Sequence, residues 1–128
     1  MKLELIEKQC LPILFYCIEC MNLKNDQLTE LNVWVNSIYR KFFHYNKWES
    51  VRECKYFLGR MDVFNLYKFR KLLFLKKLFN SNDPLMTNLA NYLKFTPEYV
   101  TSTNISNISV SLNTSVNQLK RIYIDNFA

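Results

Sequence analysis

The chain has 128 residues, of which 49% are hydrophobic and 16% aromatic, and it carries a formal net charge of +6. Such a chain is long enough to bury a core, and its apolar share excludes disorder throughout. With a single Gly and three Pro, it lacks the turn residues that a many-stranded β fold needs. We therefore predict an all-α fold, a small bundle of about five or six helices with a less ordered C-terminal segment.

Positive charge is concentrated in the middle of the chain. Residues 61–80 carry a net +4 and residues 21–60 a net +3, whereas residues 81–128 are neutral and residues 1–20 carry −1. A moderate basic excess fits a polyanionic partner such as nucleic acid, although it does not require one.

Residues 3–21 are expected to form a helix, because apolar side chains recur there at intervals of three and four. Pro12 has no amide hydrogen, so it should kink this helix or begin a second one near Leu11. Glu4 and Glu7, which precede the apolar run, do not suit a signal peptide, and no run is long enough for a membrane span. We expect an intracellular protein, cytoplasmic or nuclear, without a membrane partner.

The four cysteines lie at positions 10, 17, 20 and 54. Cys17 and Cys20, with Cys10 or Cys54, could in principle hold a zinc ion. Such a site usually has a second CxxC or a pair of histidines, and His44 is the only histidine. We therefore expect no metal and no other cofactor, and interpret the N-terminal cysteines as small buried apolar residues.

The helix expected over residues 26–43 is the element around which the chain is organised. Asn25 and Asp26 are typical of a helix start, and Arg40 and Lys41 suit the negative end of the helix dipole. Apolar residues at steps of three and four place a stripe on one face. The stripe comprises Leu28, Leu31, Val35, Ile38 and Phe42, widened by Trp34 and Tyr39.

A short helix is expected after Ser50, and a longer one over residues 63–79. Ser50 and Glu53 have the spacing of a capping box, and Gly59 is placed to end the short helix in a left-handed conformation. Asp62 is expected to cap the longer helix. The apolar faces are expected to comprise Val51, Cys54 and Phe57 or Leu58 in the first, and Val63, Leu66, Tyr67, Leu73, Phe74 and Leu78 in the second.

The longer helix is basic. No acidic residue occurs between Val63 and Asn82, and the cations are Lys68, Arg70, Lys71, Lys76 and Lys77. A face of one charge sign can bind phosphates through salt-dependent contacts, although most basic helix faces are solvated surface. Aromatic side chains could add base stacking, with core packing as the alternative. The candidates for stacking are Tyr56, Tyr67 and Phe69.

The segment after residue 80 begins with a clear break. Asp83 as N-cap and Pro84 as first helical residue begin a short helix, for which the lining residues are Leu85, Leu89 and Leu93. Alternation at Ile108, Val110 and Leu112 weakly indicates a strand or extended segment. Ser115 and Gln118 have the form of a second capping box before a last short helix with Leu119, Ile122 and Tyr123.

Several short motifs follow one another along residues 3–79. They are Leu11-Pro12-Ile13-Leu14-Phe15-Tyr16 with Glu19, then Leu28, Leu31-Asn32, Asn36, Arg40-Lys41-Phe42-Phe43, Trp48-Glu49-Ser50-Val51, Gly59-Arg60-Met61-Asp62 and Phe74-Leu75. In this order and spacing they resemble the region downstream of the palm in LINE-type non-LTR retrotransposon reverse transcriptases. One departure is Cys17, where such proteins often have a small residue such as Gly.

The resemblance implies a thumb-like helical domain over residues 1–80, followed by a C-terminal appendage over residues 81–128. A thumb holds the template–primer duplex, so the implied partner is the backbone of an RNA–DNA or DNA duplex, bound without sequence preference. The implied contact residues are Lys68, Arg70, Lys71, Lys76 and Lys77, with Arg40 and Lys41. Nothing resembles the paired palm aspartates that bind catalytic metals, so we expect no polymerase activity from this chain alone.

Two other functions remain open. An orphan or protein-interaction module would pack its apolar faces on an absent palm domain or on a second copy. The candidate patch for that role comprises Cys10, Ile13, Cys17 and Met21. An independent enzyme is disfavoured, because one histidine and one glycine offer neither an activated nucleophile nor a phosphate loop, and we expect no small-molecule substrate.

Overall fold

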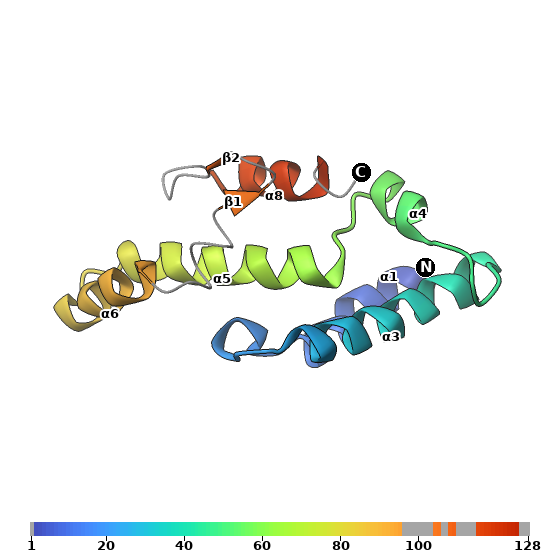
Figure 1. Ribbon diagram of the computed structural model, residues 1–128, viewed down its shortest axis with the longest axis horizontal. Helices are drawn as coiled ribbons and strands as arrows, with labels where there is room; N and C mark the ends of the chain where they lie inside the picture. The colour runs from blue at the N-terminus through green and yellow to red at the C-terminus, as the bar shows by residue number, and fades with distance from the viewer. Residues whose placement is uncertain (1, 96–103, 106–107, 110–114, 126–128) are drawn as a thin grey trace. The chain divides into compact units, whose positions relative to one another are not determined.

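The computed structural model describes residues 2–95, 104–105, 108–109 and 115–125, and most of these are helical (Figure 1). The fold is all-α, as the composition predicts. The chain divides into two compact units, Met1–Val51 and Arg52–Ala128. No helix among the described residues is both long enough and apolar enough to cross a membrane.

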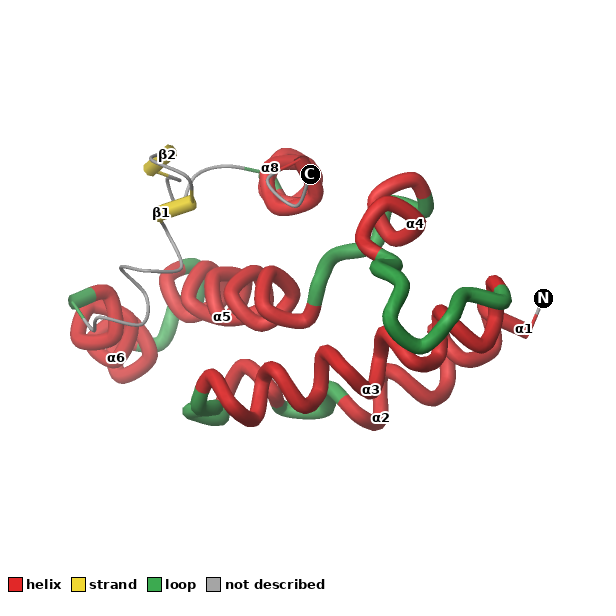
Figure 2. The backbone as a smooth tube through the Cα atoms, turned by 45° about the vertical axis from the view of Figure 1, so that its right-hand side comes forward, coloured by secondary structure: helices red, strands yellow, loops and turns green. Residues whose placement is uncertain are grey.

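The N-terminal unit consists of an irregular helical stretch and one long helix. Its elements are α1 (Lys2–Leu5), the π-helical turn η1 (Ile6–Cys10), α2 (Leu11–Leu14), the 3₁₀ turn η2 (Ile18–Cys20) and α3 (Asn25–Phe43). Figures 1 and 2 show the first three elements running alongside α3. The buried residues of this unit include Phe15, Ile18, Leu28, Val35 and Tyr39.

Pro12 changes the helix in the way that its chemistry requires. It is the second residue of α2, which begins at Leu11 as predicted. Just before it, the turn widens, and the amide of Leu11 donates to the carbonyl of Ile6, five residues back. The helix ends at Leu14 and not at residue 21, because Cys17 adopts a left-handed conformation with φ of 55°.

The long helix α3 begins one residue earlier than predicted. Lys24 occupies the N-cap position, and its amide donates to Oε1 of Gln27 at 3.0 Å, so Asn25 and Asp26 are the first helical residues and not the caps. Arg40 and Lys41 lie in the last turn, as expected. His44 then ends the helix in a left-handed conformation with φ of 57°.

The buried face of α3 is narrower than the predicted stripe. Leu28, Val35 and Tyr39 are buried, and the Tyr39 hydroxyl donates to Oε1 of Glu7 at 3.0 Å. Trp34 is 61% exposed, which corrects its placement in the stripe. A periodic pattern predicts that a face is covered, but it does not say how far the cover extends around the helix.

The C-terminal unit is built on the helix α5. Its elements are α4 (Arg52–Phe57), α5 (Val63–Phe79), α6 (Pro84–Lys94), the two-residue strands β1 (Asn104–Ile105) and β2 (Ile108–Ser109), and α8 (Val116–Asp125). The strands pair antiparallel, with Asn104 opposite Ser109 and Ile105 opposite Ile108. Ile108 is thus in a strand, whereas Val110 and Leu112 lie outside the described residues.

Two apolar clusters hold α5 in this unit. Phe69 and Leu72 pack with Tyr123 of α8. The rings of Phe69 and Tyr123 lie edge to face, with 5.6 Å between their centroids. Leu75 and Leu78 pack with Ala90 of α6. Because α5 and α6 share a cluster, they belong to one compact unit, which begins at Arg52.

Most helix ends in this unit follow the predicted chemistry. Gly59 has φ of 68°, and the Arg60 amide donates to the Lys55 carbonyl at 2.8 Å, which closes α4 in the manner expected of a glycine C-cap. Oδ1 of Asp83 accepts from the Leu85 amide at 3.0 Å. At the start of α8, Oγ of Ser115 accepts from the Gln118 amide at 3.3 Å while the Gln118 side chain accepts from the Ser115 amide at 3.2 Å. This is the predicted capping box.

Asp62 is the exception among the helix starts. It occupies the N-cap position of α5, but its side chain makes no capping hydrogen bond. Its Oδ1 lies 3.5 Å from Nζ of Lys55, a lysine that is 1% exposed. A buried ammonium needs a counter-charge more than a helix end needs a cap, since water can satisfy the helix end.

Two predicted apolar faces are displaced. In α6 the fully buried residue is Ala90, whereas Leu85 is 70% and Leu89 44% exposed, so the inward side is that of Ala90 and Leu93. In α4, Phe57 is 84% exposed and Leu58 is also exposed, although Val51 is buried as predicted.

Candidate nucleic-acid interface

The cations of α5 do not share one face. At about 100° per residue, Arg70 and Lys77 lie on one side of the helix, Lys68 lies opposite them and Lys76 lies between. Buried residues cover most of the circumference of α5 and leave one side without any, the side of Arg70 and Lys77. Lys68 and Lys76 lie among buried positions instead.

Lys71 departs furthest from the predicted interface. Its side chain is buried, with the residue 4% exposed, and Nζ lies 4.5 Å from the centroid of the Tyr67 ring. The ammonium is thus placed over an aromatic face, where the ring quadrupole attracts it. This is a correction: Lys71 belongs to the interior of the unit and does not present its charge to a phosphate backbone.

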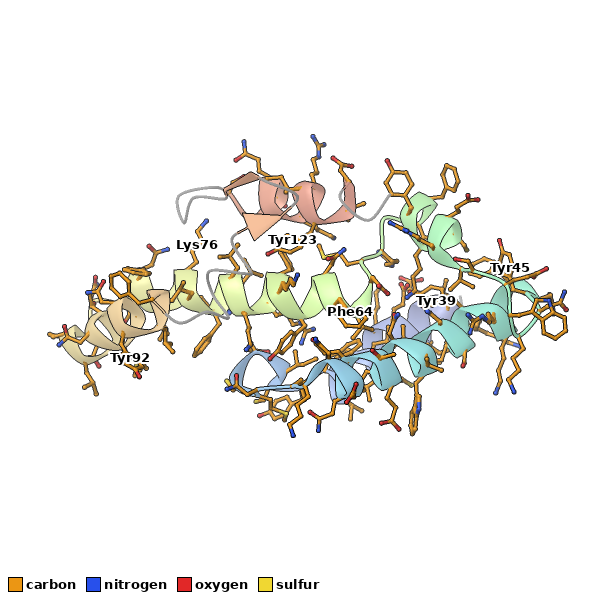
Figure 3. All side chains as sticks on the ribbon, in the orientation of Figure 1. Tyr39, Tyr45, Phe64, Lys76, Tyr92 and Tyr123 are labelled. Carbon is orange, nitrogen blue, oxygen red and sulfur yellow. The ribbon has the colours of Figure 1, made fainter. Side chains whose placement is uncertain are left out.

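The other four cations of α5 reach the surface to different degrees. Lys77 is exposed, whereas Lys68, Arg70 and Lys76 are half-buried. Figure 3 shows Lys76 projecting outward from α5. These four retain the capacity to contact phosphates, because long basic side chains bury their stems and keep their heads in water.

Arg40 and Lys41 belong to the N-terminal unit and form a separate basic surface. Nε of Arg40 donates to the carbonyl of Glu49 at 2.9 Å, so this side chain ties the end of α3 to the turn that follows. Lys41 is exposed. Lys41 therefore lies at the surface, whereas Arg40 is half-buried and also holds the turn through its hydrogen bond.

The turn after α3 is a feature that the sequence did not single out. The amide of Asn46 donates to Oε2 of Glu49 at 2.8 Å, and the Glu49 amide donates to the Asn46 carbonyl at 3.1 Å. Between these two residues lie Lys47, which is exposed, and Trp48, which is 84% exposed. The Asn-x-x-Glu spacing was the available signal, since both side chains readily bond backbone amides in turns.

The aromatic residues proposed for base stacking are mostly in the core. Tyr67 and Phe69 are each 8% exposed, so core packing accounts for both. Tyr56 is 36% exposed and lies edge to face with Phe57, with 5.9 Å between ring centroids. Of the three candidates, only Tyr56 presents its ring to solvent.

The cysteines do not assemble a site among the described residues. All four are free thiols, and Cys10 and Cys20 are exposed, which corrects their interpretation as buried apolar residues. In residues 2–95 and the shorter described segments, no group of three or more His, Cys, Asp or Glu side chains is placed to hold a metal ion.

Burial also changes the chemistry of one residue next to α5. Tyr123 of α8 is fully buried, and desolvation raises the pKa of its phenol well above the ordinary value. Figure 3 shows the ring between α8 and α5. The phenol is therefore a neutral core group and not part of a surface site.

Comparison of the chain with family models, with curated proteins and with solved structures found no match in any of the three.

Proposed function

We propose that this chain is a non-catalytic nucleic-acid-binding module, a thumb-like fragment of a reverse transcriptase that binds the backbone of a template–primer duplex without sequence preference. The observation that carries the proposal is the acid-free basic run of α5. From Val63 to Asn82 there are five cations and no acidic residue, and four of the five are at least partly exposed. The resemblance of residues 3–79 to the post-palm region of LINE-type enzymes supports the same function.

Affinity in this proposal comes from phosphate contacts and counterion release. Each phosphate that a cation neutralises makes the slope of log affinity against log salt more negative by about 0.9 for a duplex. Lys68, Arg70, Lys76 and Lys77 supply the contacts on α5, and Lys41 adds a second basic surface. Lys71 is left out, because its charge is buried over Tyr67.

The test is binding of the whole chain to a labelled RNA–DNA hybrid across a salt series. The variant carries Lys68→Gln, Arg70→Gln, Lys76→Gln and Lys77→Gln. A control with the same loss of charge changes the exposed residues Lys2, Lys24, Lys120 and Arg121 to Gln. We expect weaker binding and a shallower salt slope in the α5 variant than in the control. Equal losses in the two variants would show that only net charge matters, and no binding at low salt by the folded chain would sink the proposal.

A second candidate is a protein-interaction module that self-associates or packs on an absent palm domain. It is favoured by a row of exposed apolar residues on α6, where Leu85 is 70%, Leu89 44% and Tyr92 72% exposed. Three members of the N-terminal candidate patch are also exposed, Cys10, Ile13 at 79% and Met21 at 49%. An oligomeric chain that is indifferent to the hybrid at every salt concentration would establish this function in place of the first.

A further inference from the structure

Both tryptophans of this chain lie at the surface of the N-terminal unit. Trp48 is 84% and Trp34 61% exposed, although the chain has only these two. Tryptophan is among the most costly side chains to leave in water, since it hides a large apolar area when it is buried. A large aromatic ring held in solvent calls for a ligand with an apolar face.

Hydrogen bonds from α3 and within the turn hold the backbone that carries Trp48. His44 ends α3 in a left-handed conformation, and the Tyr45 amide donates to the Arg40 carbonyl at 3.0 Å. Nε of Arg40 reaches across to the Glu49 carbonyl, and the Glu49 carboxylate accepts from both the amide and the side chain of Asn46. The ring of Trp48 is thus presented from a backbone that is already ordered, which lowers the entropic cost of binding.

Residues 40–49, the last turn of α3 and the turn after it, carry a net charge of +2. Lys41 and Lys47 are exposed, and the one acidic residue of the turn, Glu49, is engaged with Asn46. Lys41 follows Trp34 by seven residues in α3, so the two lie on the same side of that helix, about two turns apart. Figure 3 shows Tyr45, which is 39% exposed, at the end of α3 where the turn begins. Exposed cations and aromatic rings therefore occur together on α3 and the turn that follows it.

We infer that the turn of residues 44–48, with Lys41, binds unpaired bases of a single-stranded nucleic acid. Trp48 is the platform on which a base stacks, and Lys41 and Lys47 contact the phosphates on either side of it. This inference rests on the proposed function and adds to it a preference for single strands at a surface other than α5. A membrane surface fits less well, because interfacial binding typically uses a helix with Trp, Phe or Leu along one face, whereas residues 44–49 form a turn.

The test uses the whole chain with a labelled oligothymidylate, the RNA–DNA hybrid and an abasic oligomer that has phosphates but no bases. Trp48→Ala should lower affinity for the oligothymidylate by about 5- to 160-fold, the range that one base–aromatic stack supplies. Affinity for the abasic oligomer and for the hybrid should stay within about twofold. Trp48→Phe should recover part of the loss. Phe57→Ala is the matched control, because Phe57 is also 84% exposed but lies in the other unit.

A direct readout is the fluorescence of Trp48 in a Trp34→Phe background. Stacking should quench it with the oligothymidylate and leave it unchanged with the abasic oligomer. Unchanged affinity of Trp48→Ala for the oligothymidylate would overturn the inference while leaving the proposed function intact, provided that the α5 variant still loses the hybrid. Failure of the wild-type chain to bind either nucleic acid at low salt would overturn both. Binding to vesicles of phosphatidylserine and phosphatidylcholine, lost in Trp48→Ala and without any binding of the oligomer, would assign the turn to a membrane surface instead.

Discussion

At the scale of single residues, Tyr123 shows how enclosure changes a titration. The phenol is completely buried against Phe69 and Leu72, and desolvation raises its pKa above the ordinary 10.0. Above pH about 10 the unfolded chain releases this proton while the folded chain keeps it. The stability that this group contributes is therefore fully present below pH about 10 and is lost as the pH rises further.

Replacing Tyr123 by Phe tests this dependence. Wild-type stability should fall above pH about 10 by up to about 1.4 kcal/mol per pH unit more than that of Tyr123→Phe. Urea unfolding from pH about 8 to about 11 measures the difference. Tyr92→Phe, at a position that is 72% exposed, should follow the wild-type curve. Parallel curves for Tyr123→Phe and the wild type would show that the buried phenol does not govern alkaline unfolding.

At the scale of helices, ends were more predictable than faces. The bounds of α5, the start of α6 at Pro84 and the capping box of α8 agree with the sequence, because caps depend on residues only a few positions apart. Faces depend on what covers them. In α6 an apolar row of Leu85 and Leu89 looked like the inward side, and only the packing of Ala90 against α5 reveals the true one.

The inward side of α6 can be tested by a pair of substitutions. Ala90→Leu adds volume where Ala90 is completely buried against Leu75 and Leu78, and should destabilise the chain by about 1–3 kcal/mol. Leu89→Ala removes volume next to it at an exposed position and should change stability by less than about 0.5 kcal/mol. Denaturant unfolding of both variants measures the contrast. A larger loss of stability in Leu89→Ala than in Ala90→Leu would show that Leu89 faces inward, as periodicity alone suggested.

The dependence of helix faces on tertiary packing also explains what the sequence analysis missed in the candidate interface. Charge spacing identified a basic helix, but the burial of most sides of α5 and the position of Lys71 over Tyr67 follow from tertiary contacts. Trp48 was named only as part of a motif, because the exposure of a side chain is a property of the fold and not of the residue type. Trp34 was assigned to the core for the same reason.

At the scale of the whole molecule, the chain leaves much apolar surface in water. The exposed row of α6, Leu85, Leu89 and Tyr92, is spaced for a partner helix, since residues four and seven apart share a side. Figure 3 shows Tyr92 directed away from the body of α6. Apolar rows of this kind are typical of surfaces that another chain covers.

Serine at these three positions tests association through α6. Sedimentation across a concentration series should show the wild-type chain shifting toward larger species and the Leu85→Ser, Leu89→Ser, Tyr92→Ser variant remaining monomeric. A variant with Tyr16→Ser and Phe57→Ser removes apolar rings that are 76% and 84% exposed elsewhere, and should associate like the wild type. Equal loss of association in both variants would show that the chain associates through nonspecific hydrophobic contacts and not through α6.

The widened turn at Ile6–Cys10 has a consequence for the length of the chain itself. A π turn closes with one residue more than an α turn, so it is equivalent to a one-residue insertion in a regular helix. Deletion of Gln9, which is exposed, would let the turn close as an α-helix and leave the residues before it on nearly the same side, because the wider turn already absorbs the extra residue. Glu7 should then keep the hydroxyl of Tyr39 as its hydrogen-bond donor. The wide turn thus lets the N-terminal turns keep their pairing with α3 while the chain carries one residue more than a regular helix would hold.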